Sequence, residues 1–269
     1  MLGGNRVITA DTATSLPARA AGAMVVCGSH GGLYPGYLLA KAGVRAAILC
    51  DAGIGREEAG IASLPYFAAL GIPAAAASHL SCRIGDVDDM LARGTISRAN
   101  EIAARLDVRP GDPVAEAARK LAAAPATVTA APPSIGEGRN AVDQAGRRPI
   151  LLLDSAAMVG PGDEGAIIVT GSHGGLVGGD PAKALKATGF AGVFNDAGIG
   201  VENAGLARLP ALDARRIAAF TVAADSCRIG DARSSFEDGV ISAVNEAAHA
   251  LGARVGAQAR GVLLDWAAR

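Results

Sequence analysis

The sequence of 269 residues has few aromatic side chains and little net charge. Phe, Trp and Tyr make up 3% of the residues, the formal net charge is −1, and Lys and Arg form no run. Nucleic-acid-binding surfaces use basic side chains to bind phosphates and aromatic side chains to stack on bases. We therefore expect no nucleic acid partner.

Membrane-spanning segments and paired-cysteine motifs are also missing. No apolar run approaches the roughly 18 residues of a spanning helix, and residues 1–6 lack the basic and apolar regions of a signal peptide. None of the four cysteines belongs to a Cys-x-x-Cys pair, which is typical of proteins in a reducing compartment. We expect a cytoplasmic protein without a membrane partner.

Motifs for nucleotide cofactors are absent as well. The sequence contains no phosphate-binding loop motif and no Gly-x-Gly-x-x-Gly motif. We therefore predict no cofactor, while a divalent metal and a homo-oligomer stay open. Half of the residues are apolar, which is enough for one or two cores of a globular protein.

The sequence does contain a long internal repeat. Four motifs occur twice in the same order: Gly-Ser-His-Gly-Gly-Leu at 28–33 and 171–176, Asp-Ala-Gly-Ile-Gly at 51–55 and 196–200, Ser-Cys-Arg-Ile-Gly-Asp at 81–86 and 226–231, and Gly-x-Ile-Ser-x-x-Asn-Glu at 94–101 and 239–246. Solenoid repeats span about 20–50 residues, so this longer repeat indicates duplication of a whole domain. We expect two like halves related by a pseudo-twofold axis.

The predicted domain organisation follows from the extent of the two copies. Residues 1–124 form the first α/β repeat and residues 149–269 form the second. Between them, residues 125–148 are rich in Pro, Gly and Ala and include the pair Pro132 and Pro133, which indicates an exposed connector.

Within each copy, short apolar runs alternate with helix candidates. In the first copy the predicted strands are 7–10, 23–27, 45–50 and 72–77, and the predicted helices are 36–42, 57–70 with a bend at Pro65, a short helix after Asp86, 96–106 and a last helix that opens at Asp112 and Pro113. This alternation predicts an α/β fold in which a mostly parallel sheet is covered on both faces.

Three of the repeated motifs directly follow predicted strands. In a parallel sheet these strand ends share one edge, where α/β proteins bind their ligands. A Gly-rich turn there permits close approach and directs N–H groups at an anion, so we infer an anionic or carboxylate-bearing ligand. The Gly and Ser residues expected to bind it are Gly28, Ser29, Gly31, Gly32, Ser172, Gly174 and Gly175.

Histidine and aspartate at these strand ends are candidates for acid–base chemistry. His30 and His173, within the Gly-rich turns, can serve as general acid or base, or can simply cap a helix or bind a backbone carbonyl. Asp51 and Asp196 can orient a histidine, bind a metal or bind substrate hydroxyls, or can cap the following helix. His79 receives no weight, because an alanine stands at its position in the other copy.

A thiol and a guanidinium are adjacent in the third motif. Arg83 and Arg228 can clamp a substrate carboxylate, and each favours a thiolate at its neighbour, Cys82 or Cys227. The alternative is a buried cysteine that ends a strand, beside an arginine that pairs with Asp86 to fix the turn.

The fourth motif places Asn100 and Asn245 inside predicted helices, where asparagine is unfavourable. Their amides can therefore reach the ligand or bridge the two halves. The remaining Gly and Ser residues of this motif need no function, because they suit a helix start.

The order of Ser29, His30 and Gly31 after one strand and of Cys82 and Arg83 after a later one partly resembles caspase-type cysteine peptidases. Their Gln-Ala-Cys-x-Gly motif is absent and both copies carry the pattern, so no residue role is carried over.

Three functions are compatible with these motifs. The first is a cofactor-independent hydrolase of an amide, lactam or related bond in a small carboxylate-bearing molecule. In it, an arginine binds the carboxylate, the Gly-rich turn stabilises an oxyanion, the histidine moves the proton, aspartate orients the histidine, and cysteine is an optional nucleophile. The second is an isomerase or lyase, such as a racemase that uses two thiols as bases, and the third is a non-catalytic anion-binding or regulatory protein.

Overall fold

The computed structural model describes residues 6–125 and 131–269. Their contacts define two compact units: the first comprises the chain up to Ile54 together with 59–136 and 200–202, and the second comprises 55–58, 137–199 and 203–269. Each unit therefore contains a short segment from the opposite half of the sequence. The predicted connector, 125–148, spans the boundary between 136 and 137.

The first unit is built on a five-stranded sheet with strands in sequence order. The strands are β1 (Val7–Ala10), β2 (Met24–His30), β3 (Ala46–Cys50), β4 (Ala74–Ala77) and β5 (Ile96–Ala99). β1 to β4 are parallel, and β5 joins β4 antiparallel. The carboxyl ends of β2, β3 and β4 therefore lie along one edge.

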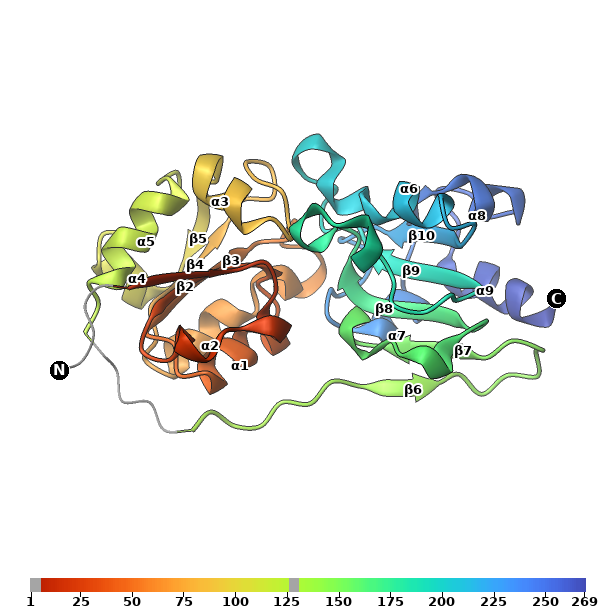
Figure 1. Ribbon diagram of the computed structural model, residues 1–269, viewed down its shortest axis with the longest axis horizontal. Helices are drawn as coiled ribbons and strands as arrows, with labels where there is room; N and C mark the ends of the chain where they lie inside the picture. The colour runs from red at the N-terminus through yellow and green to blue at the C-terminus, as the bar shows by residue number, and fades with distance from the viewer. Residues whose placement is uncertain (1–5, 126–130) are drawn as a thin grey trace. The chain divides into compact units, whose positions relative to one another are not determined.

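Helices cover both faces of this sheet (Figure 1). On one face, α1 (Leu33–Lys41) and α2 (Ser63–Ala69) pack with Val25 and Cys27 of β2. On the other face, α3 (Val87–Arg93), α4 (Glu101–Arg105) and α5 (Val114–Ala122) pack with Met24 and Val26. Successive side chains of a strand point to opposite faces, so the apolar residues 24–27 of β2 supply both cores. The shorter turns are η1 (Ala13–Ser15), η2 (Ala18–Ala20) and η3 (Arg56–Ile61).

The second unit holds a six-stranded sheet. Its strands are β6 (Arg139–Ala141), β7 (Ile150–Leu153), β8 (Ile167–His173), β9 (Ala191–Asn195), β10 (Ala218–Val222) and β11 (Ile241–Val244). β7 to β10 are parallel in sequence order, as β1 to β4 are, and β11 joins β10 antiparallel, as β5 joins β4. The predicted α/β class with mostly parallel sheets is confirmed.

The helices of the second sheet form two layers. One contains α7 (Ala232–Glu237), α8 (Glu246–Ala250) and α9 (Ala259–Ala268), with Trp266 fully buried, and the other contains α6 (Arg208–Asp213). Where the first unit has α1, the second has only short turns. The shorter turns of this unit are η4 (Ala156–Met158), η5 (Pro161–Asp163), η6 (Val177–Gly179), η7 (Pro181–Lys183) and η8 (Val201–Leu206).

Two predicted helices differ from the structure. The helix predicted at 96–106 is wrong: β5 and α4 share this segment, and Asn100 between them is the N-cap of α4. The helix predicted at 57–70 is wrong in its first part: Glu57 and Glu58 have left-handed backbones within η3, and the α-helix α2 begins only at Ser63. The predicted connector, 125–148, includes β6, whose three residues are exposed and which pairs antiparallel with β7; its residues 126–130 lie outside the described residues.

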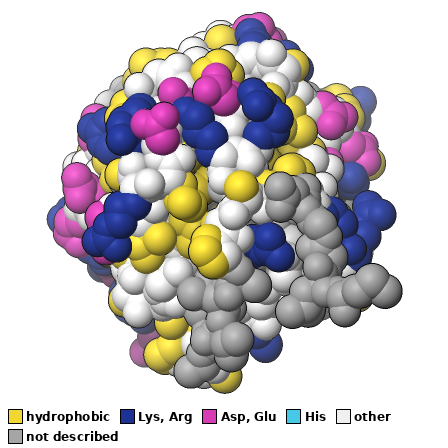
Figure 2. All heavy atoms as spheres, turned by 90° about the vertical axis from the view of Figure 1, so that its left-hand side faces the viewer, with side chains coloured by type: hydrophobic (Ala, Val, Ile, Leu, Met, Phe, Trp, Pro, Cys, Tyr) yellow, Lys and Arg dark blue, Asp and Glu magenta, His cyan; other side chains and the backbone are white. Residues whose placement is uncertain are grey.

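The distribution of charged side chains on the surface agrees with the small net charge of the sequence. On the face shown in Figure 2, basic and acidic side chains are interspersed rather than gathered by sign. Within the part of the chain that the structure describes, no helix is both long and apolar enough to span a membrane.

Candidate functional site

Asp51 ties together the loops that follow β3 and β4. Its buried carboxylate oxygen Oδ1 accepts hydrogen bonds from the backbone N–H groups of Gly53 at 3.2 Å and His79 at 2.9 Å. In the second unit, Asp196 accepts the equivalent bonds from Gly198 and Ala224, both at 2.9 Å. The repeated aspartate thus stabilises the two loops in each unit by hydrogen bonding to the backbone.

In the first unit the same carboxylate also binds an imidazole. His79 Nδ1 lies 2.8 Å from Asp51 Oδ1, and the His79 side chain is 18% exposed. Burial acts to raise the pKa of Asp51, but hydrogen bonds from His79 and Ser97 outweigh it, so the pKa falls below its usual value. Asp51 is therefore ionised at neutral pH and Nδ1 donates its proton to it, which leaves Nε2 as the nitrogen that can exchange a proton.

Sequence reasoning did not give His79 any weight, because Ala224 stands at its position in the second copy. The sequence does show that only one copy carries this titratable residue. It does not show the contact with Asp51, because 28 residues separate the two along the chain.

The amides of the Gly-rich turns already bind acceptors of the protein. Gly31 N–H donates to the carbonyl oxygen of Cys50 at 2.6 Å, and Gly174 N–H donates to that of Asn195 at 2.7 Å. A Cβ atom on Gly31 would lie 2.6 Å from the carbonyl oxygen of Gly60, which accounts for the glycine. These contacts tie the turn to its neighbours and provide no evidence for the predicted anion cradle.

The serines of the same motif and its other glycines also have structural bonds. Ser29 Oγ accepts from Ala13 N–H at 3.0 Å, and Ser172 Oγ accepts from Ala156 N–H at 2.8 Å, so both hold the loop that follows the first strand of their sheet. Further contacts within the protein are made by the carbonyl oxygen of Gly28 with Gly85 N–H, the N–H of Gly32 with His30 Nδ1, and the carbonyl oxygen of Gly175 with Arg208 Nε.

His30 and His173 lie at the ends of β2 and β8, and both are buried. His30 Nδ1 accepts a hydrogen bond from Gly32 N–H at 3.2 Å, and burial lowers the pKa of His30 from 6.5 to about 4. The imidazole of His30 is thus neutral at physiological pH. Of the histidines of the first unit, His79 is more exposed than His30 and is paired with a carboxylate.

The repeated cysteines are buried in their own units. Burial raises the pKa of Cys82 to about 12, and it raises that of Cys227 as well. Both thiols contact backbone carbonyl oxygens, those of Ser78 at 3.4 Å and Ala223 at 3.6 Å. Since the thiolate is the nucleophilic form, these environments disfavour a role in catalysis.

The repeated arginines pair with the carboxylates of their own turns. Arg83 Nε and Nη2 donate to Asp86 at 3.1 and 3.0 Å, and Arg228 donates to Asp231 at 3.2 and 2.9 Å. These bonds agree with the interpretation in which the arginine fixes the turn. The Nη1 atom of each arginine also donates to a glutamate, which is Glu202 for Arg83 and Glu57 for Arg228.

Asn100 and Asn245 lie away from the strand-end edge. Asn100 caps α4 by accepting from Ala103 N–H at 2.9 Å, and it bonds to Ala74 N–H and the Ile72 carbonyl at the beginning of β4. Asn245 caps α8 in the same way. Within its own unit, each asparagine therefore lies away from the repeated aspartate at the strand ends, Asn100 from Asp51 and Asn245 from Asp196.

Backbone strain is concentrated in the loop that follows Asp51. Ala52, Ile54, Glu57 and Glu58 all have left-handed φ angles between 48° and 63°. The equivalent loop after Asp196 has the same four positions in this conformation. Such residues cost about 1–3 kcal/mol each and cluster at functional sites.

No family model matches the sequence, and the chain has no significant match among curated proteins or solved structures. Across residues 6–125 and 131–269, no group of three or more His, Cys, Asp or Glu side chains is arranged to hold a metal ion.

Proposed function

We propose that the first unit is a cofactor-independent enzyme that transfers protons with His79, oriented by Asp51. The observation that carries the proposal is the 2.8 Å contact between His79 Nδ1 and Asp51 Oδ1 in a partly exposed setting at the strand ends. A carboxylate that fixes the tautomer of an imidazole and stabilises its protonated form is the recurrent arrangement of a general base.

The reaction that we propose is hydrolysis of an amide or lactam bond in a small carboxylate-bearing molecule. His79 Nε2 removes a proton from water as the water oxygen attacks the carbonyl carbon, and the imidazolium is stabilised by Asp51. When the tetrahedral intermediate collapses, the C–N bond breaks and the same proton passes from Nε2 to the leaving nitrogen. Water is the nucleophile here, because the Cys82 thiol is buried and its pKa is raised.

We also propose that the chain arose by duplication and that only its first copy carries the proton-transfer pair. The repeated motifs and the equivalent hydrogen bonds of Asp51 and Asp196 support this history. The second copy has Ala224 where the first has His79, so it retains the scaffold without the imidazole. The pseudo-twofold relation between the copies stays a prediction.

The test is a panel of N-acetyl amino acids and five- and six-membered lactam carboxylates, followed by proton NMR in water and in D₂O. Wild-type protein should open one of these amide bonds, and His79→Gln and Asp51→Asn should lower the rate by about 10²–10⁴. Asp196→Asn is the matched control and should retain the rate. The proposal is overturned if wild-type protein converts no compound or if His79→Gln keeps full activity. Exchange at a substrate α-carbon in D₂O without hydrolysis would favour an isomerase.

A further inference from the structure

Near the strand-end edge, the two copies differ at several positions whose side chains carry charge or titrate in the first copy, and three of these differences concern the contacts of Asp51 and Arg83. The first-copy residues with their second-copy counterparts are His79 and Ala224, Asp89 and Ser234, and Arg93 and Asp238. His79 belongs to the proposed proton-transfer pair. The other two differences concern how a carboxylate is held.

Asp89 holds two guanidinium groups close together in the first unit. Its side chain is 8% exposed, and its Oδ1 contacts Arg83 Nη2 at 3.1 Å and Arg93 Nε at 2.9 Å. Its Oδ2 accepts a hydrogen bond from the backbone N–H of Arg83 at 2.7 Å. The bonds to Asp86 and Asp89 use Nε and Nη2 of Arg83 and Nε of Arg93, so the Nη1 atoms of both arginines remain for another carboxylate.

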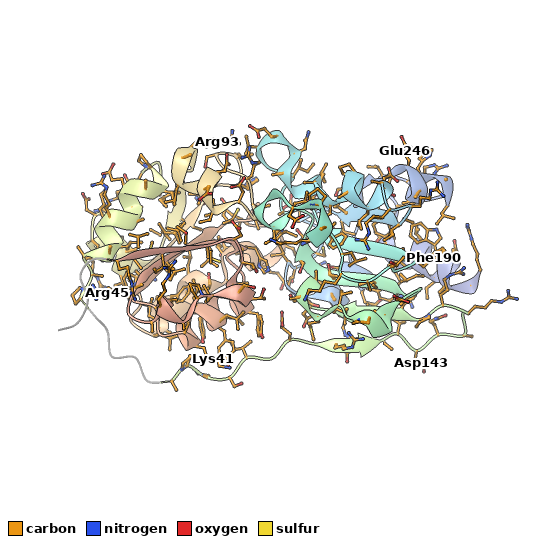
Figure 3. All side chains as sticks on the ribbon, viewed as in Figure 1. Lys41, Arg45, Arg93, Asp143, Phe190 and Glu246 are labelled. Atoms are coloured by element: carbon orange, nitrogen blue, oxygen red, sulfur yellow. The ribbon has the colours of Figure 1, made fainter. Side chains whose placement is uncertain are left out.

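Glu202 supplies that carboxylate. Its Oε2 lies 2.8 Å from Arg83 Nη1 and its Oε1 lies 2.7 Å from Arg93 Nη1, so each oxygen has its own arginine. The Glu202 side chain is 52% exposed. The preceding residue, Val201, donates its N–H to the carbonyl oxygen of His79 at 2.9 Å. The two-arginine fork, formed by Arg83 and Arg93 around the Glu202 carboxylate, therefore lies beside the proposed proton-transfer pair. Arg93 is labelled in Figure 3.

The second unit lacks this fork. There, Glu57 makes longer contacts, at 3.3 Å to Arg228 and at 3.5 Å to its neighbour Arg56. Asp238, which replaces Arg93, pairs with Arg56 at 3.3 Å. A fork that gives one guanidinium to each carboxylate oxygen, ordered by a buried aspartate, is therefore a feature of the first unit.

We propose that Arg83 and Arg93 form the subsite for the substrate carboxylate, and that Glu202 occupies it as an internal ligand that the substrate displaces. The inference rests on the proposed function for the reaction, whereas carboxylate binding itself does not require His79. Replacing one carboxylate by another preserves every charge contact of the two Nη1 atoms, so the exchange leaves no arginine unpaired. Glu202 has a left-handed backbone with φ 55°, an energetically costly conformation that clusters at ligand clamps and switch regions.

The test uses succinate as the probe and isothermal titration calorimetry as the readout, at constant ionic strength. Glu202→Gln should bind succinate about tenfold more tightly than wild-type protein, a change within the range of two exposed ion pairs. The double variant Glu202→Gln with Arg93→Gln should lose this gain. Glu57→Gln, the matched change in the second unit, should show no gain. Absence of a gain in Glu202→Gln, or its persistence without Arg93, would overturn the proposal.

Further variants and a second ligand complete the test. If Glu202→Gln does not fold by circular dichroism, wild-type protein and Arg93→Gln are compared, and equal succinate affinity overturns the proposal. An equal gain for inorganic phosphate overturns the assignment to carboxylates. His79→Gln should bind succinate with the affinity of wild-type protein, because His79 is not part of the carboxylate subsite. Full turnover in that variant would overturn the proposed function but not the proposed carboxylate subsite.

Discussion

His79 Nδ1 lies 2.8 Å from Oδ1 of Asp51, although 28 residues separate them in the sequence. The same oxygen accepts the backbone N–H of His79, so both the main chain and the ring of this residue are fixed by one carboxylate. In the second unit, Asp196 keeps the backbone bond with Ala224, which has no ring to orient. Both units therefore share the backbone contact of the aspartate, and the first unit has an imidazole there in addition.

Replacing Asp51 by Asn should destabilise the protein at neutral pH by about 1–3 kcal/mol, with a smaller loss in acid. Burial acts to raise the pKa of Asp51, but hydrogen bonds from His79 and Ser97 bring it below 3.8. A lowered pKa in the folded state stabilises above the unfolded pKa, and this stability is lost as pH falls through the folded value. Urea unfolding at pH 7 and pH 3 measures the difference, with Asp196→Asn for comparison. A loss that is equal at both pH values would contradict the prediction.

The buried His30 should make the protein less stable as pH falls from about 6.5 toward 4. Burial lowers the pKa of His30 to about 4, so between these pH values the unfolded chain binds a proton that the folded chain does not. The stability is complete above the unfolded pKa and decreases by up to about 3 kcal/mol. His30→Asn should show a flatter dependence in urea unfolding at pH 7.0 and 4.5, and an unchanged slope in that variant would show that another group titrates.

Asn100→Ala should cost about 2–4 kcal/mol of unfolding free energy, because the buried amide caps α4 and satisfies two backbone groups at the start of β4. Asn245→Ala should cost a similar amount, since its bonds are equivalent. Urea denaturation measures both. A cost below about 0.5 kcal/mol together with lost turnover would instead support the predicted ligand contact.

The Cys82 thiol should react slowly with iodoacetamide in the folded protein. Its side chain is buried and its pKa is raised to about 12, so thiolate is scarce at pH 8. Mass spectrometry after timed alkylation, with and without urea, follows each cysteine separately. Alkylation of Cys82 in native protein at the rate of the unfolded chain would restore the cysteine as a candidate nucleophile.

The sheets were predictable because their strands are short apolar runs bounded by turn residues. β1 begins and ends as predicted at Val7–Ala10, and β3 lies within the predicted 45–50. The segment after Gly94 was not predictable in this way, because Ile96 to Ala99 pairs with β4 through contacts that are distant in sequence. The left-handed Glu57 likewise has no local signal, since only tertiary contacts hold a non-glycine residue in that conformation.

The sequence by itself determined the α/β class, the order of strands along the chain and the repeated motifs at the strand ends, because these follow from hydrophobic periodicity and from self-comparison. Tertiary structure decided which repeated residues serve the backbone and which lie together as a candidate site. Periodicity locates strands, whereas proton transfer and carboxylate binding depend on separations of about 3 Å between side chains of different loops. The positions of His79 beside Asp51 and of Glu202 between Arg83 and Arg93 were set by that packing.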